Sequence, residues 1–109
     1  MFKVNGKTIT MTRGDTVKID VTMKDADGQT YTPVEGEVIR FKAKRNWIDE
    51  SAIIEKAIPI DTLILHIAPE DTHNLQFGTY VYDIQITHLN GDVDTFISKG
   101  TLIISEETD

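Results

Sequence analysis

The chain has 109 residues, the length of one domain, with a formal net charge of −7 at pH 7 and no cysteine. These values exclude a disulfide scaffold and a cysteine nucleophile, and the acidic charge argues against binding to nucleic-acid phosphates. No apolar run approaches the roughly 18 residues that span a bilayer, and the first residues do not resemble a signal peptide. We therefore expect one domain over residues 1–109 that binds neither nucleic acid nor membrane.

Alternation of apolar and polar residues dominates the first half of the chain and is typical of strands with one buried face. Asp27-Gly28 is typical of a tight turn between two such strands, and Pro33 lies in the loop that follows. The pattern predicts strands over residues 7–11, 16–23, 37–44, 52–58 and 62–67.

The second half of the chain begins with a break in this alternation. Pro69-Glu70-Asp71 favours one short helical turn, since proline suits a first helical position and acids complement the positive end of a helix. The clearest strand, over residues 80–87, is followed by the hairpin signal Asn90-Gly91. A returning strand follows over residues 93–104, with Ser98-Lys99-Gly100 as a bulge. About seven strands at this spacing predict an all-β, immunoglobulin-like antiparallel β-sandwich.

The apolar phase of the strands predicts the buried core, because side chains alternate between the two faces of a strand. The residues expected in the core are Val17, Ile19, Val21, Ile39, Phe41, Leu63, Leu65, Tyr80, Tyr82, Ile84, Ile86, Leu102 and Ile104.

Tyr80 is a candidate for a structural corner. The segment Gly78-Thr79-Tyr80-Val81-Tyr82 follows the helical turn, where immunoglobulin-like domains place a corner tyrosine two residues before a cysteine. Tyr82 stands at that cysteine position, which suits a sandwich without a disulfide. We expect the Tyr80 hydroxyl to bind a backbone group in residues 69–76, and the alternative is two core aromatics with no special corner.

One segment begins like a calcium-binding loop. Asp25, Asp27 and Gly28 match its start, but Gly36 stands where the loop needs its closing glutamate. A plain hairpin turn is therefore the favoured interpretation, and we expect no metal site here.

Other candidate sites are incomplete. His66, His73 and His88 lack zinc-ligand spacing and are expected to face solvent. No serine stands in a nucleophile elbow. Arg13-Gly14-Asp15 matches an integrin-binding tripeptide, but three residues are a weak signal and a turn before a strand is the favoured interpretation. The sequence therefore predicts a protein that is not an enzyme and has no cofactor.

Trp47, the only tryptophan, lies in a polar context beside Ile48. The favoured interpretation is that Trp47 caps one end of the core. The alternative is that Trp47 and Ile48 form an exposed anchor at an interface, where tryptophan is enriched.

Edge strands provide a second way to dock, because they expose unpaired N–H and C=O groups. Lys56 lies in the middle of the strand over residues 52–58, where its charge discourages pairing with another strand. The strand over residues 7–11 has a lysine only at its start. The latter is the predicted docking edge, with Thr8 and Thr10 as candidate interaction residues.

Several short segments, in this order and spacing, resemble one family of phage proteins. They include Arg13-Gly14-Asp15-Thr16, Glu35-Gly36-Glu37-Val38, Pro69-Glu70-Asp71-Thr72, Gly78-Thr79-Tyr80-Val81-Tyr82 and Asn90-Gly91-Asp92. The chain is similar to the immunoglobulin-like N-terminal domain of upper baseplate proteins, which also occurs alone as small virion-associated proteins. The family belongs to tailed phages and prophages of low-GC Gram-positive bacteria.

The resemblance implies a non-catalytic structural or adaptor module of a phage or prophage particle, in the baseplate, the tail or as a decoration protein. Its partners would be other phage structural proteins or further copies of itself. It would be found in the host bacterial cytoplasm during assembly and then in the virion. The alternative is a host-surface adhesion or ligand-binding β-sandwich that uses a loop site, because one sandwich fold supports many functions.

Overall fold

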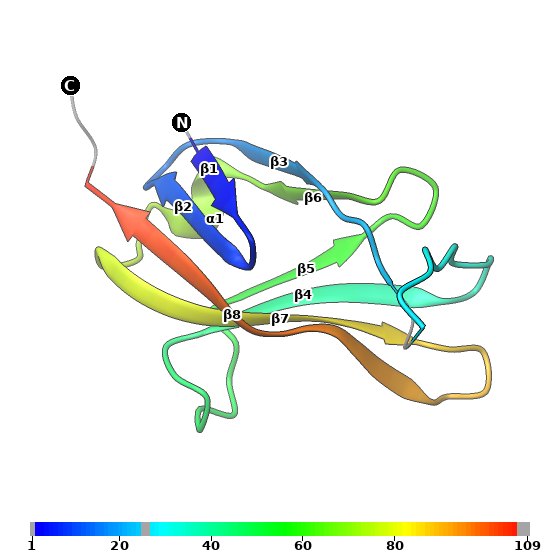
Figure 1. The fold of residues 1–109 in the computed structure, drawn as a ribbon. Coiled ribbons are helices and arrows are strands. Elements are labelled where there is room, and N and C mark those ends of the chain that lie inside the picture. The colour runs from blue at the N-terminus through cyan, green and yellow to red at the C-terminus, as the bar shows by residue number, and fades with distance from the viewer. Residues whose placement is uncertain (1, 25–26, 107–109) are drawn as a thin grey trace.

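The protein consists of two layers of β-sheet (Figure 1). The structure, a computed structural model, describes residues 2–24 and 27–106, so the predicted calcium-loop residue Asp25 lies outside the described range. The described elements, in chain order, are β1 (Phe2–Asn5), β2 (Thr8–Thr12), β3 (Val17–Asp20), β4 (Val38–Lys44), β5 (Ile54–Ile58), β6 (Ile64–Ile67), α1 (Pro69–Thr72), β7 (Gly78–Thr87) and β8 (Val93–Ser105).

The larger layer is a six-stranded sheet with the strand order β1-β2-β8-β7-β4-β5, and the smaller layer pairs β3 with β6. Figure 1 shows the β3–β6 pair lying over one face of the large, curled sheet. The predicted all-β sandwich with one short helical turn is thereby confirmed. Two details differ: the described residues form eight strands rather than about seven, and β2 pairs with β8 in parallel.

The core lies between the two layers and follows the predicted strand faces. All the predicted core residues are buried except Ile19 and Leu63, which pack against the core while remaining partly exposed. Leu63 has a φ of 54° in the turn that precedes β6, so it does not follow the alternation of that strand. Core residues outside the prediction are Ile9, Met11, Met23, Ala43, Ile54, Ile58 and Ile67.

The N-terminal hairpin corrects the predicted docking edge. Gly6, with a φ of 62°, turns the chain so that β1 pairs with β2 on one side while β8 pairs with β2 on the other. Thr8 and Thr10 therefore lie on a strand that is hydrogen-bonded along both edges, and the prediction of an open edge there is wrong. The edge of the sheet on this side is β1.

The predicted helical turn and bulge are both present. Helix α1 begins at Pro69, and the carboxylate of Asp71 accepts a hydrogen bond of 2.7 Å from the backbone N–H of Ala68. The bulge lies within β8 at Lys99, which has a φ of 57°, and the pairing of β7 with β8 shifts register nearby. Strand β8 pairs with β7 on both sides of the bulge, and with β2 only after it.

Candidate functional site

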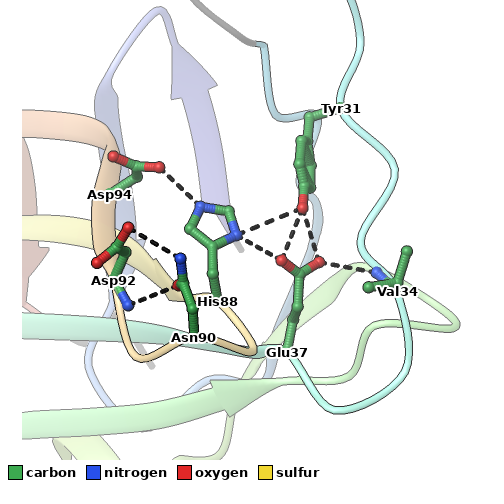
Figure 2. Close-up of polar contacts among 7 residues, drawn as sticks. All are labelled: Tyr31, Val34, Glu37, His88, Asn90, Asp92 and Asp94. Atoms are coloured by element: carbon green, nitrogen blue, oxygen red, sulfur yellow. Dashed lines mark hydrogen bonds and ion pairs between the residues drawn. The ribbon is translucent and has the colours of Figure 1, made fainter.

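A cluster of polar side chains lies at the end of the sandwich where β7 turns into β8 (Figure 2). We call it the hairpin cluster: Tyr31, Glu37, His88 and Asp94. Tyr31 and Glu37 come from the segment before β4, His88 from the turn after β7, and Asp94 from β8. The Asn90-Gly91 turn, with Gly91 at a φ of 91°, brings His88 and Asp94 to the same side.

His88 bridges two carboxylates. Its Nδ1 lies 2.5 Å from Glu37 Oε2, and its Nε2 lies 2.7 Å from Asp94 Oδ2. Both ring nitrogens can donate at once only when the imidazole carries its second proton. The geometry is therefore that of an imidazolium held between two negative groups.

Glu37 is the buried centre of the cluster, with a side chain that is 3% exposed. Its Oε1 accepts a hydrogen bond of 2.8 Å from the backbone N–H of Val34, and the Tyr31 hydroxyl lies 2.7 Å from both carboxylate oxygens. A buried carboxylate is stable only when its oxygens are paired in this way. The Tyr31 ring also packs 5.6 Å from Phe96, centroid to centroid, which ties the segment to β8.

These contacts shift the pKa of each titrating group in the cluster. The pKa of Glu37 is lowered by the hydrogen bond from Val34, and also by those from Tyr31 and His88. The pKa of His88 is raised because Glu37 and Asp94 accept hydrogen bonds from the charged ring. The pKa of Tyr31 is raised by its hydrogen bond to Glu37 and by burial. At neutral pH all three shifts favour the state in which the cluster is fully bonded.

The side chains of the cluster bind one another and so hold two segments of the chain together. Glu37 and both nitrogens of His88 are engaged within the cluster, so no basic nitrogen of this ring points free toward a substrate. Within the described residues, no group of three or more metal-ligating side chains is placed to hold an ion. What the arrangement does is bind the segment before β4 to the β7–β8 hairpin.

One of the three histidines does not have the solvent exposure that the sequence predicted. His66 and His73 are exposed as expected, but His88 is half-buried in the cluster, and the prediction that it faces solvent is wrong. The alternation of β7 ends at Thr87, so the pattern says nothing about the next side chain. The available signal was a histidine two residues before Asn90-Gly91, with acids one and three residues after it.

The predicted tyrosine corner is confirmed. Tyr80 is buried, and its hydroxyl donates a hydrogen bond of 2.6 Å to the carbonyl oxygen of Gln76. The acceptor lies within residues 69–76, as expected from the Gly-x-Tyr pattern. The bond joins the loop after α1 to the start of β7.

Arg13-Gly14 forms a turn that is bound to the α1 region. The Arg13 guanidinium donates a hydrogen bond of 3.2 Å to the carbonyl oxygen of Leu75 and lies 4.2 Å from the ring centroid of Phe77. The backbone N–H of Gly14 donates a hydrogen bond of 2.8 Å to the hydroxyl of the fully buried Thr72. The tripeptide thus has a structural explanation within the fold.

Trp47 does not cap the core, so the favoured sequence interpretation is wrong. Trp47 is 47% exposed and Ile48 is 89% exposed. Both lie in the loop between β4 and β5, which projects from the sheet on the side away from β3 and β6 (Figure 1). Asn46 shapes the loop, because its side-chain oxygen accepts a hydrogen bond of 3.2 Å from the Ile48 N–H. We call Trp47 and Ile48 the loop tip.

A second exposed apolar surface lies beside the hairpin cluster, and no sequence pattern predicted it. We call it the hairpin-end patch: Val34, Val38, Leu89 and Val93. Val38 and Val93 flank Thr87 across three neighbouring strands. Leu89 packs over Gly36, where a Cβ would lie 2.6 Å from its Cδ2.

An open groove of about 390 Å³ lies along the side of the sandwich, between β5 and β6. Lys18 and His66 stand side by side on it, and Lys56 is joined to Asp71 at 2.9 Å. The lining residues are Lys18, Lys56, Ala57, Pro59, Thr62, Ile64 and His66.

No known family model, curated protein or solved structure matches this chain. Among the described residues, no helix has the length and apolar character needed to cross a bilayer.

Proposed function

We propose that this chain is a non-catalytic structural or adaptor module that acts through protein–protein contacts. The observation that carries the proposal is the loop tip, where a tryptophan is 47% exposed and the adjacent isoleucine is 89% exposed. Exposed apolar side chains grouped at a projecting site are typical of contact surfaces, and tryptophan is enriched among residues that dominate binding energy.

The non-catalytic part of the proposal is supported by the hairpin cluster. The ionisable side chains that the fold brings together there bind one another, and the buried Glu37 is fully paired. A catalytic acid or base instead needs a polar atom directed at a reacting group. This cluster is arranged to hold two segments together.

The bacteriophage or prophage setting of the proposal rests on the sequence resemblance alone. In that setting the partners are other structural proteins of the particle, in the baseplate, tail or capsid surface. The chain is then made in the cytoplasm of the host bacterium and afterwards carried in the virion.

The test is direct binding of the purified chain to each purified structural protein encoded beside its gene, measured by biolayer interferometry. The loop variant Trp47→Ser/Ile48→Ser removes the anchor, and Val4→Ser on β1, another exposed apolar position, is the matched control. We expect one protein to bind the wild type and the control, and to bind the loop variant at least about tenfold more weakly. Equal binding by the loop variant, or no binding to any of these proteins, contradicts the proposal.

The second candidate is a host-surface adhesion or ligand-binding sandwich, and the groove between β5 and β6 favours it. Its volume of about 390 Å³ lies within the range of small-molecule sites, and Lys18 on its wall suits an anionic ligand. The check is an NMR titration with anionic cell-wall polysaccharide fragments. Shifts of the Lys18 and His66 resonances, unaffected by the loop variant, support this candidate over an adaptor role.

A further inference from the structure

The loop tip and the hairpin-end patch lie at opposite ends of one strand. Strand β4 begins at Val38, which belongs to the hairpin-end patch, and ends at Lys44, three residues before Trp47. Figure 1 shows the β4–β5 loop and the β7–β8 hairpin at the two ends of the large sheet. The molecule is elongated, with principal extents of 45 × 28 × 23 Å, so a contact at one end leaves the other end open.

The loop end carries free positive charge in a chain whose net charge is negative. Lys42, Lys44 and Arg45 precede the loop tip, and none of them forms an ion pair in the described part of the chain. Asp49 and Glu50 follow the tip and offset part of this charge. Across the sheet Lys42 is flanked by Glu55 and Asp83, so the cations left beside Trp47 are Lys44 and Arg45.

The hairpin end has the opposite character. Its apolar side chains are widely exposed, at 68% for Leu89 and 55% for Val93. Acidic residues border them: Glu35 and Asp92 are exposed, and Asp94 is 66% exposed although it also binds His88. This surface suits an apolar anchor that arrives with positive charges beside it.

From this complementarity we infer that copies of the chain associate head to tail, with the loop tip of one copy on the hairpin-end patch of the next. Trp47 and Ile48 supply the apolar anchor, and Lys44 and Arg45 face Glu35 and Asp92. The inference deepens the proposed function, because it rests on that function and names a second copy as the partner of the same loop.

The contact is heterologous, since each copy uses two different surfaces. Such contacts build rings when the rotation closes and filaments when it does not. A two-fold contact between two hairpin ends would instead bring acids against acids, which is unfavourable. The hairpin cluster fixes the positions of two residues of the hairpin-end patch, because Glu37 binds the Val34 N–H and His88 directly precedes Leu89.

The experiment uses two variants that each lose one surface. The loop variant is Trp47→Ser/Ile48→Ser, and the patch variant is Val34→Ser/Leu89→Ser. The control is Phe2→Ser/Val4→Ser, which removes exposed apolar side chains from β1. Molar mass is measured by sedimentation equilibrium at moderate salt, which screens the charge of −7, between about 10 µM and about 1 mM, where small interfaces associate. Circular dichroism and thermal melting show that each variant is folded.

Wild type and control are expected to gain mass beyond a dimer as concentration rises, while each variant alone stays a monomer. An equal mixture of the two variants has one intact loop and one intact patch, and it is expected to form a dimer and nothing larger. In the mixture, adding Arg45→Glu to the chain with the intact loop should weaken the dimer at least about tenfold, and Glu35→Arg in the other chain should restore it.

Three results overturn the inference. They are a wild type that stays monomeric throughout, variants that still assemble alone, and a mixture that gives no dimer although both chains are folded. The wild type could stay monomeric and still bind, through Trp47, a structural protein encoded beside its gene. That result contradicts the head-to-tail contact but supports the proposed function. Self-association without any such partner supports the contact and contradicts the adaptor role.

Discussion

Glu37 and His88 are 51 residues apart in the chain, yet Glu37 Oε2 lies 2.5 Å from His88 Nδ1. The contact joins the segment that leads into β4 to the turn that follows β7. Since Val34 and Tyr31 bind the same carboxylate, this one side chain contacts three separate groups: the Tyr31 hydroxyl, the Val34 N–H and the His88 ring. Removing the charge of Glu37 should therefore affect more than one contact.

We predict that Glu37→Gln lowers the melting temperature by several degrees. The amide cannot hold an imidazolium as a carboxylate does, and its NH2 group becomes an extra donor facing the Val34 N–H or the Tyr31 hydroxyl. The measurement is thermal unfolding followed by circular dichroism at pH 6. Glu35→Gln, two residues away and exposed, is the matched control and should melt like the wild type. Equal melting temperatures for both variants would show that the cluster adds nothing to stability.

The second prediction concerns pH. The raised pKa of His88 means that its contribution to stability is complete below its ordinary value of 6.5 and is lost as pH rises through the raised value. The lowered pKa of Glu37 means that its contribution is complete above its ordinary value of 4.5 and is lost as pH falls through the lowered value. The cluster should stabilise most between these two ordinary values.

The measurement for this prediction is the free energy of unfolding across pH 4 to 9, for the wild type and for His88→Gln. In the wild type, the free energy of unfolding should decrease above pH 6.5 as His88 loses its proton. The variant has no imidazole at this position and should not show that decrease. His66→Gln, at an exposed position on β6, is the control and should keep the wild-type profile. An NMR titration in which the His88 ring loses its proton below pH 6.5 contradicts the assignment.

Period-two alternation predicted the strands that form the centre of the fold. It placed Ile39 and Phe41 in the core and Arg40 on the outer face, as observed, because β4 packs on only one side. The same reasoning missed β1, although Asn5-Gly6 is the same hairpin signal as Asn90-Gly91. The strand has only 4 residues, too few for a clear alternation, and Phe2 remains 40% exposed even in the fold.

The candidate site was much less predictable than the strands. Tyr80 could be identified because its role depends on a local pattern, with the acceptor only 4 residues away. The hairpin cluster depends on how two distant loops meet, and periodicity carries no information about that. Trp47 was placed wrongly because a tryptophan is equally suited to a core and to an interface.

The third prediction is that Tyr80→Phe destabilises the fold by about 0.5–1.5 kcal/mol without changing it, the usual net value of one hydrogen bond. The variant keeps the ring in the core and removes only the donor to the Gln76 carbonyl oxygen. Tyr82→Phe is the matched control, since the Tyr82 hydroxyl makes no hydrogen bond to any described residue. Urea unfolding of the three proteins gives the comparison. A Tyr80→Phe midpoint no lower than that of the control would show that the corner bond is not stabilising.

The fourth prediction concerns Gly100, which lies beneath the ring of Tyr82. A Cβ at position 100 would stand 2.4 Å from two carbons of that ring, closer than any tolerated contact. The ring has little room to move, since Tyr82 is 3% exposed and packs 5.1 Å from Phe41, centroid to centroid. Gly100→Ala should therefore cost about 1–3 kcal/mol, the usual range for overpacking a core.

The double variant Gly100→Ala/Tyr82→Leu separates this clash from any general effect of alanine in the strand. Leucine removes the ring carbons that the new methyl group would meet, so the cost of Gly100→Ala should fall sharply in that background. Residues in direct contact typically show coupling energies of about 0.5–3 kcal/mol, which urea unfolding of the four proteins resolves. An unchanged cost of Gly100→Ala in both backgrounds would mean that the approach of Tyr82 is not the reason for glycine at this position. Gly100 is not among the residues with a positive φ, although Lys99 beside it has a φ of 57°, so the close approach of Tyr82 is the reason for glycine that the structure supports.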